Sequence, residues 1–285
     1  MLPREILLHL DASEAAATRL RLAMSLAASH GSRLSALFVD EWNLQQRETR
    51  ATAEMGLVAA RDLDRLDRSI VAEIERSATR LRTLLTSYHR EHGLEFEWLR
   101  SEAGSDTALV PLLPYFDLCI LGRDSLNSAA HGDRASCERL VMLSAAPIIF
   151  VPTDAKPSSL GKRILVAWDA SRPAARAFND AMPLLERADR ITIVTVQDGL
   201  DREPPPDLQP LQQRLRRRCA QIEALTIRAP AQTPVASALQ AKARELDCDL
   251  MVAGAFGHSR LKECLFGGVS RSLLQNMTLP VLMSH

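Results

Sequence analysis

The sequence predicts a tandem α/β protein whose two halves are each a doubly wound, parallel-sheet domain. Three observations predict it. Four short apolar runs recur in the same order in both halves of the 285-residue chain, the runs are rich in Ile, Leu and Val, and segments with helical spacing separate them. Nearly continuous apolar runs are typical of strands covered on both faces of a parallel sheet. Strands that alternate with helices predict βαβ units with right-handed crossovers.

The repeat is clearest at the first strand of each half. REILLHLDAS at residues 4–13 matches KRILVAWDAS at residues 162–171, an offset of 158 positions that places Asp11 over Asp169. Further apolar runs pair in the same order: 33–40 with 190–198, 117–122 with 249–254, and 146–151 with 279–284. A chain that repeats itself over this length predicts two copies of one structural unit.

Helices are predicted between these strands. From Arg61 to His92 apolar side chains step by three or four, with Arg, Asp and Glu between them, as on a helix that covers a sheet. A shorter helix is predicted over 208–222, after three consecutive prolines. Strand-like segments at 94–99 and 223–229 follow the two helices.

The linker between the domains is predicted at residues 154–161, where Pro, Ser and Gly accumulate. The first domain then spans residues 1–153 and the second residues 162–285. The first half is longer mainly because of its long helix and residues 41–60, a segment that suits a loop, a lid or an inter-domain contact.

Composition and charge exclude several classes of function. The chain is 46% hydrophobic and 25% charged, with 35 basic and 35 acidic residues. This balance is typical of a globular protein and argues against nucleic acid or an anionic membrane as a partner. Asp11 interrupts the first apolar run before it reaches the length of a signal or spanning segment. Five cysteines without a CxxC favour neither a disulfide framework nor a zinc site, so we expect a cytoplasmic protein with reduced thiols.

The residues that follow the strands are the candidates for chemistry, because open parallel sheets bind ligands beyond the carboxyl ends of their strands, where strand order reverses. An aspartate follows the first strand of each half, Asp11 or Asp169, and a glycine ends the fourth, Gly122 or Gly254. An aspartate there can accept hydrogen bonds from ribose hydroxyls, and glycine amides can approach phosphates without a side chain in the way.

The stronger loop follows the fourth strand of the second half and leads into a short predicted helix. Its candidate residues are Gly254, Gly257, Gly267, Gly268, Val269 and Ser270. A helix start presents free amides and the positive end of a dipole, which suits a phosphate, and Ser270 can cap the helix or donate to a phosphate oxygen. The loop is neither a Walker A sequence nor GxGxxG, so its glycines alone are equally compatible with two turns.

Taken with Asp169 and the repeat, this loop resembles the G-x2-G-x9-G-[ST] pattern of the universal stress protein family, and the likeness extends over the whole chain in two copies. The resemblance implies two tandem Rossmann-like domains, each with a five-stranded parallel sheet, that pack as a pseudo-dimer. It implies ATP, or AMP or ADP, as the ligand. The sequence itself requires no metal, and Mg²⁺ can accompany ATP. It also implies that Asp169 and the backbone of Val196 hold adenosine, with Gly254, Gly257, Gly267, Val269 and Ser270 around the ribose and phosphates.

The chain departs from the family pattern in two places. Position 268 is glycine where the pattern has Ser or Thr, and the lost hydroxyl would weaken binding by about 1.5 to 3 kcal/mol unless Ser270 compensates. In the first half Ser125 replaces the second glycine, and Arg134 stands near the third. We expect the first domain to keep the fold and Asp11 but to have lost nucleotide binding.

The expected function is therefore that of a stress-response or signalling protein that binds an adenine nucleotide in its second domain, without catalytic residues. Two rivals stay open. A slow ATP hydrolase would need a residue to orient water, and only His258 and Asp169 are candidates. A scaffold without ligand is favoured by Gly268 and by the degenerate first half. Whether two tandem chains associate as a homodimer is also open.

Overall fold

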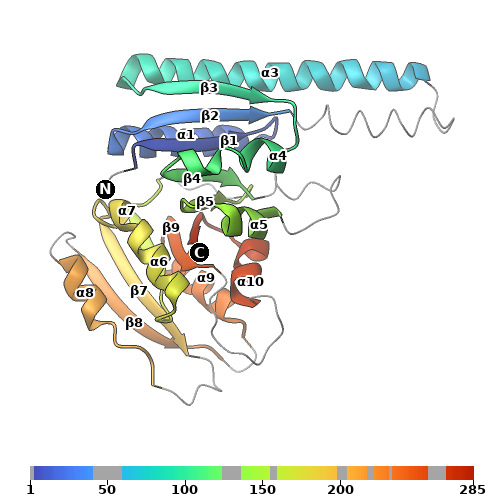
Figure 1. Ribbon diagram of the computed structural model, residues 1–285. Coiled ribbons are helices and arrows are strands. Elements are labelled where there is room, and N and C mark those ends of the chain that lie inside the picture. The colour runs from blue at the N-terminus through green and yellow to red at the C-terminus, as the bar shows by residue number, and fades with distance from the viewer. Residues whose placement is uncertain are drawn as a thin grey trace. The chain divides into compact units, whose positions relative to one another are not determined.

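The computed structural model describes residues 3–40, 60–123, 136–154, 159–197, 204–216, 221–230, 233–255 and 268–285. Strands and helices alternate along the chain (Figure 1), which confirms the predicted α/β fold. The chain divides into two compact units, one of residues 4–136 and the other of residues 137–285 with residues 1–3. The domain boundary at 154–161 stays a prediction, and residues 41–59 lie outside the described residues.

The unit of residues 4–136 contains a four-stranded parallel sheet in the order β3-β2-β1-β4. Its strands are β1 (Glu5–Leu10), β2 (Arg33–Val39), β3 (Phe96–Ser101) and β4 (Leu118–Gly122). Strand order reverses between β1 and β4, so the switch point of this unit lies beside Asp11, which directly follows β1.

Helices in this unit follow the predicted pattern. They are α1 (Ala15–His30), α3 (Ala60–His92), α4 (Ser105–Leu109) and the 3-10 helix η1 (Leu113–Tyr115). The long helix α3 confirms the periodic segment, since Ile74, Leu81 and Leu85 on its apolar face are buried. Helix α1 packs against α3, and its apolar side chains complete the core over β1 and β4.

The unit of residues 137–285 contains strands in the order β5-β10-β9-β6-β7-β8. They are β5 (Ile148–Val151), β6 (Arg163–Ala167), β7 (Arg190–Gln197), β8 (Ile222–Arg228), β9 (Leu250–Gly254) and β10 (Val281–Ser284). Strands β6 to β10 form the predicted five-stranded parallel sheet. Strand β5, the last apolar run of the first half, pairs antiparallel with β10, a pairing that the sequence analysis did not predict.

The helices of this unit cover its sheet. They are α5 (Ser136–Leu143), of which residues from Cys137 onward belong here, α6 (Arg172–Asp180), α7 (Met182–Leu185), α8 (Gln209–Arg216), α9 (Val235–Glu245) and α10 (Gly268–Asn276). Helix α6 packs on β9 and β10, and α9 packs against α10. Ile222 begins β8 instead of ending the predicted helix, because its neighbours alternate between half-buried and exposed as on an edge strand. Within the described ranges, no helix is long and apolar enough to cross a bilayer.

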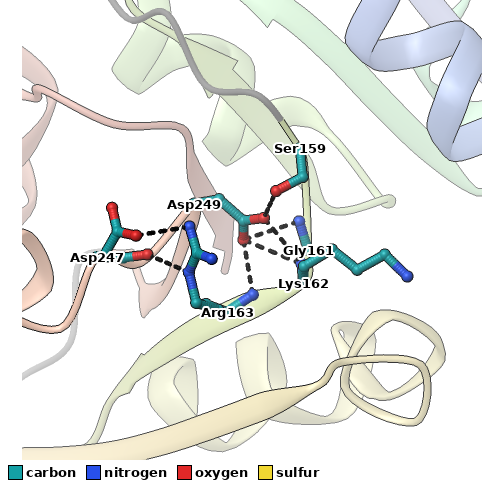
Figure 2. A network of polar contacts seen from close by, with 6 residues as sticks. All are labelled: Ser159, Gly161, Lys162, Arg163, Asp247 and Asp249. Carbon is teal, nitrogen blue, oxygen red and sulfur yellow. Dashed lines mark hydrogen bonds and ion pairs between the residues drawn. The ribbon is translucent and has the colours of Figure 1, made fainter.

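A buried aspartate anchors the start of β6. Asp249 accepts hydrogen bonds from the amides of Gly161, Lys162 and Arg163 at 3.0 to 3.1 Å and from Ser159 Oγ at 2.5 Å (Figure 2). These donors are the residues that lead from the predicted linker into the strand. The aspartate therefore fixes where β6 begins.

The earlier unit repeats this anchor. Asp117, the repeat equivalent of Asp249, accepts hydrogen bonds from the amides of Arg4 and Glu5 at 2.7 and 3.1 Å. Both aspartates precede a strand and bind the start of its parallel neighbour, so they lie at the amino edge of the sheet. Ligands of such sheets bind at the opposite edge, and these carboxylates therefore stabilise the fold.

Candidate functional site

The candidate site lies at the carboxyl edge of β6 and β9, where strand order reverses in the later unit. These two strands are parallel neighbours, with Val166 opposite Val252. Asp169 follows β6 by two residues, and Gly254 ends β9. The topology therefore brings the end of β6 and the end of β9 to one edge of the sheet, as the sequence predicts.

Asp169 is exposed, and its surroundings hold it at the start of helix α6. Its Oδ1 accepts a hydrogen bond from the amide of Ser171 at 2.9 Å, and Ser171 Oγ in turn accepts one from the amide of Ala174 at 3.2 Å and caps the helix. Ala170 between them has a φ of 61°, a left-handed conformation that costs a residue with a β-carbon about 1 kcal/mol or more. The carboxylate is thus oriented by the chain, and among the described residues no cation pairs with it.

The equivalent carboxylate in the first half, Asp11, is closed, by which we mean that a buried cation already binds it. Asp11 Oδ2 lies 2.8 Å from Nη2 of Arg19, whose side chain is 2% exposed. Arg19 Nε also donates to the carbonyl oxygen of His9 at 2.8 Å. At the offset of 158 positions the partner of Arg19 is Ala177, which is fully buried and carries no charge. The two halves therefore differ in this ion pair: a buried guanidinium binds the carboxylate of Asp11, and the equivalent position in the second half has an alanine.

A buried histidine completes the closed cluster of the first half. His9 is fully buried, and its Nε2 lies 3.1 Å from Ser105 Oγ. The pKa of His9 is lowered from 6.5 to about 4, mainly by burial and also by the charge of Arg19, against an opposing effect of Asp11. The ring is therefore neutral at pH 7, and its Nδ1 has no hydrogen-bond partner in the part of the chain that the structure describes. The repeat equivalent of His9 is Ala167.

Gly254 is required by packing. A β-carbon built there would overlap the backbone nitrogen of Ala174 and lie 2.5 Å from the carbonyl carbon of Pro173. Only a glycine lets the end of β9 approach the first turn of α6 this closely. The predicted phosphate contact of its amide stays a prediction.

The other loop residues divide between described and undescribed parts of the chain. Gly268 is the first residue of α10, and a β-carbon there would meet no atom of the described residues within 4 Å. Val269 is 40% exposed, and Ser270 is buried against the unit. Gly257 and Gly267 lie outside the described residues. The start of α10 thus follows β9 as the sequence predicts.

Val196 lies near the end of β7, the neighbour of β6 on the side opposite β9. It is half-buried and stands opposite Ile227 of β8. The chain after β6 is tied to β7 by two hydrogen bonds, from the amide of Trp168 to the oxygen of Val194 at 2.9 Å and from Thr195 Oγ1 to the oxygen of Trp168 at 2.8 Å. Val196 therefore shares the carboxyl edge with Asp169.

No group of three or more potential metal ligands occurs among the described residues. The thiols of Cys119 and Cys248 are also poorly suited to nucleophilic chemistry. Burial raises the pKa of Cys119 to about 12 and that of Cys248 to about 11, the latter helped by the negative charge of Asp249. Cys119, Cys137 and Cys248 are not in disulfides.

Comparison with known protein families finds a match for the later part of the chain. Residues 161–285 match the model of the universal stress protein family. This part of the chain belongs to the universal stress protein family. No curated protein matches the sequence. The family match covers the predicted second domain, with Asp169 and the loop from Gly254 to Ser270 inside it.

Solved structures extend the fold of a universal stress protein to the whole chain. A universal stress protein from Archaeoglobus fulgidus aligns with a TM-score of 0.67 at 18% identity, covering 98% of this chain and 95% of its own. A protein of unknown function from Pseudomonas aeruginosa aligns with a TM-score of 0.57 at 13% identity, covering 99% and 92%. A shorter universal stress protein from A. fulgidus, in complex with dAMP, matches at 14% identity and a TM-score of 0.31, covering 53% of this chain and 98% of its own.

Sequence reasoning missed Arg19, which distinguishes the two halves. The sequence does carry a sign of it, because Arg19 stands among mostly apolar positions of α1 and takes the place of an alanine in the repeat. The left-handed conformation of Ala170 had no signal, since alanine is an ordinary residue for a helix start and glycine is the residue that marks positive φ.

Proposed function

We propose that this universal stress protein binds an adenine nucleotide, ATP or else AMP or ADP, at the carboxyl edge of β6 and β9. In this proposal Asp169 accepts hydrogen bonds from the ribose, and the backbone of Val196 contacts adenosine. The glycines of the loop and the start of α10 receive the phosphates at Gly254, Gly257, Gly267, Gly268, Val269 and Ser270. Mg²⁺ would accompany ATP and neutralise part of its charge.

The observation that carries the proposal is the difference between Asp169 and Asp11. Asp169 is exposed and oriented by the amide of Ser171, whereas Asp11 is held by the buried guanidinium of Arg19. An exposed carboxylate beside two strand ends and a helix start has the donors and acceptors that a nucleoside phosphate needs. Because Asp11 is already paired with Arg19, we propose one nucleotide per chain, bound in the second half.

The start of α10 supports a phosphate at this edge. Among the described residues nothing stands within 4 Å of a β-carbon built on Gly268, the first residue of this helix. The helix dipole favours an anion there.

The proposed role of the nucleotide is regulatory. Besides Asp169, the candidate for orienting water in a hydrolase is His258, which lies outside the described residues. We therefore propose a stress-response or signalling protein of the cytoplasm in which nucleotide occupancy alters conformation or partner choice. Slow hydrolysis of ATP and a role as a scaffold without ligand are the alternatives that the experiment must separate.

The test compares two matched aspartate variants. Asp169→Asn keeps the acceptor oxygen for Ser171 but removes the charge, and Asp11→Asn makes the same change in the closed half. ATP is titrated calorimetrically into wild type and both variants, and release of ADP is followed. We expect one site per wild-type chain and a loss of affinity of about tenfold or more in Asp169→Asn, because a hydrogen bond to a charged group is worth about 1.5 to 3 kcal/mol.

Each alternative has a distinct result. Asp11→Asn should retain the wild-type affinity and stoichiometry. Absence of ATP binding by the wild type would favour the scaffold, and ADP release that falls with Asp169→Asn would favour the hydrolase. Two sites per chain, or equal losses in the two variants, would contradict the assignment of the site to the second half.

A further inference from the structure

The antiparallel pairing of β5 with β10 has a local two-fold symmetry. Leu282 stands opposite Ile149, with Val281 opposite Phe150 and Met283 opposite Ile148. Ile149 and Leu282 are themselves repeat equivalents, because residues 146–151 match 279–284 at an offset of 133 positions. The two strands therefore meet about an axis that passes between the two equivalent residues at the centre.

Helices α5 and α10 carry an ion pair that obeys the same symmetry. Nε of Arg271 lies 2.7 Å from Oε1 of Glu138, and its Nη2 lies 3.2 Å from Oε2. The two residues are 133 positions apart, the same offset that relates Ile149 to Leu282. Glu138 and Arg271 are therefore equivalent residues of the repeat, and they face one another with opposite charges in a two-pronged contact.

The apolar part of this pairing does not distinguish one half from the other. Both strands present buried aliphatic or aromatic side chains over most of their length, so a strand could pair with its counterpart from either half or from a second copy. The charged residues do distinguish these pairings, because the symmetric position is Glu138 on α5 and Arg271 on α10. If β10 paired with β10 of another copy, Arg271 would face Arg271, and if β5 paired with β5, Glu138 would face Glu138.

We infer that the Glu138–Arg271 pair selects the pairing of the two halves within one chain over pairing with like halves of a second copy. Only the combination of β5 with β10 brings opposite charges together at this position. Like charges in contact disfavour the alternatives, which is how charged residues commonly set partner choice. The interaction surface is the β5–α5 and β10–α10 edge, and its partner is the other half of the same chain.

The first test is a double-mutant cycle in the full chain, with Glu138→Arg, Arg271→Glu and the exchanged double variant. The matched controls are Glu245→Lys and Lys242→Glu, which change the charge of an ion pair on α9. We expect each single variant to lower the thermal midpoint by about 2 to 4 °C or more relative to its control. The double variant should recover most of the loss, and the recovery should shrink in high salt. Additive losses would overturn the inference.

The second test measures partner choice. Glu138→Arg and Arg271→Glu chains are unfolded, mixed and refolded together, and native mass spectrometry follows species of twice the chain mass of 31.5 kDa. In the mixture two opposite-charge contacts form only between different chains. We expect the heterodimer fraction to rise several-fold over a refolded mixture of mass-labelled and unlabelled wild type. A fraction equal to the wild-type mixture, or equal homodimer fractions in each variant alone, would overturn the inference.

Discussion

Arg19 and Asp11 form a buried ion pair in the first half of the chain, with 2.8 Å between Nη2 and Oδ2. The guanidinium also holds the carbonyl oxygen of His9, so it bridges helix α1 and the end of β1. A buried charge that loses its partner is costly, because it is neither hydrated nor compensated.

We predict that Arg19→Ala destabilises the protein by about 3 to 5 kcal/mol. The reverse truncation, Asp11→Ala, should be comparably destabilising because it leaves the guanidinium uncompensated. The double variant should be more stable than the sum of the two losses predicts. Denaturant unfolding of the four proteins measures the coupling, and full additivity would show that the two side chains act independently.

The close packing of Gly254 on Ala174 leads to a second prediction. Gly254→Ala should lower the free energy of unfolding by about 1 to 3 kcal/mol, since the added methyl group meets backbone that cannot move without shifting α6. Gly268→Ala is the matched control, because its β-carbon would meet no atom within 4 Å in the part of the chain that the structure describes. Equal midpoints for the two variants in thermal unfolding would contradict this packing.

Position 268 supplies a prediction about affinity. Gly268→Ser adds a hydroxyl at the start of α10, where a β-carbon would clash with none of the described residues. It also restores the residue type of the family pattern. If the nucleotide binds as proposed, the affinity for ATP should rise by about tenfold or more, the value of a hydrogen bond to a charged group. Calorimetric titration of ATP checks this result. Gly268→Ala controls for the effect of the β-carbon on the helix.

The buried His9 predicts acid sensitivity of the fold. Folding lowers its pKa from 6.5 to about 4, so the native state binds fewer protons than the unfolded chain between these values. The free energy of unfolding is therefore unaffected by His9 above pH 6.5, and it falls as the pH drops from 6.5 towards 4. The loss is about 3 kcal/mol, from 1.36 kcal/mol per unit of pKa. His9→Ala, which copies Ala167 of the repeat, should flatten the pH dependence of unfolding measured between pH 7 and 4.5.

The described thiols should be slow to react in the folded protein. Burial raises the pKa of Cys119 to about 12 and of Cys248 to about 11, so almost no thiolate exists at pH 8. We expect alkylation at both residues to be at least tenfold faster after unfolding, as measured by mass spectrometry of their peptides. Rapid modification of Cys119 in the native protein would contradict its complete burial.

Much of the fold could be predicted because its signals are local. Apolar runs at the strands and the three-to-four spacing from Arg61 to His92 report burial directly, and the structure places strands and a helix there. The edge of the sheet that carries Asp169 and Gly254 followed from the rule for strand ends. The shorter helix was predicted to reach Ile222, but Ile222 begins a strand. Half-buried edge strands and amphipathic helices have similar short patterns.

The candidate site was predicted in its residues but not in its contacts. The sequence treats Gly254 as a phosphate neighbour, while the structure shows a steric reason for the same glycine. It treats Asp11 and Asp169 as equivalents, while the structure separates them through Arg19. These differences arise from side chains of other elements, which the spacing within one motif does not report.

The sequence by itself determined the α/β class, the repeat, the family pattern from Gly254 to Ser270 and the aspartates after the first strands, because hydrophobic periodicity and motif spacing are properties of neighbouring residues. Only the tertiary structure decided that Asp11 is closed and Asp169 open, and that Glu138 meets Arg271. Each of these depends on the packing of separate elements, in the last case of residues 133 positions apart, and a contact over that distance exists only once the chain has folded.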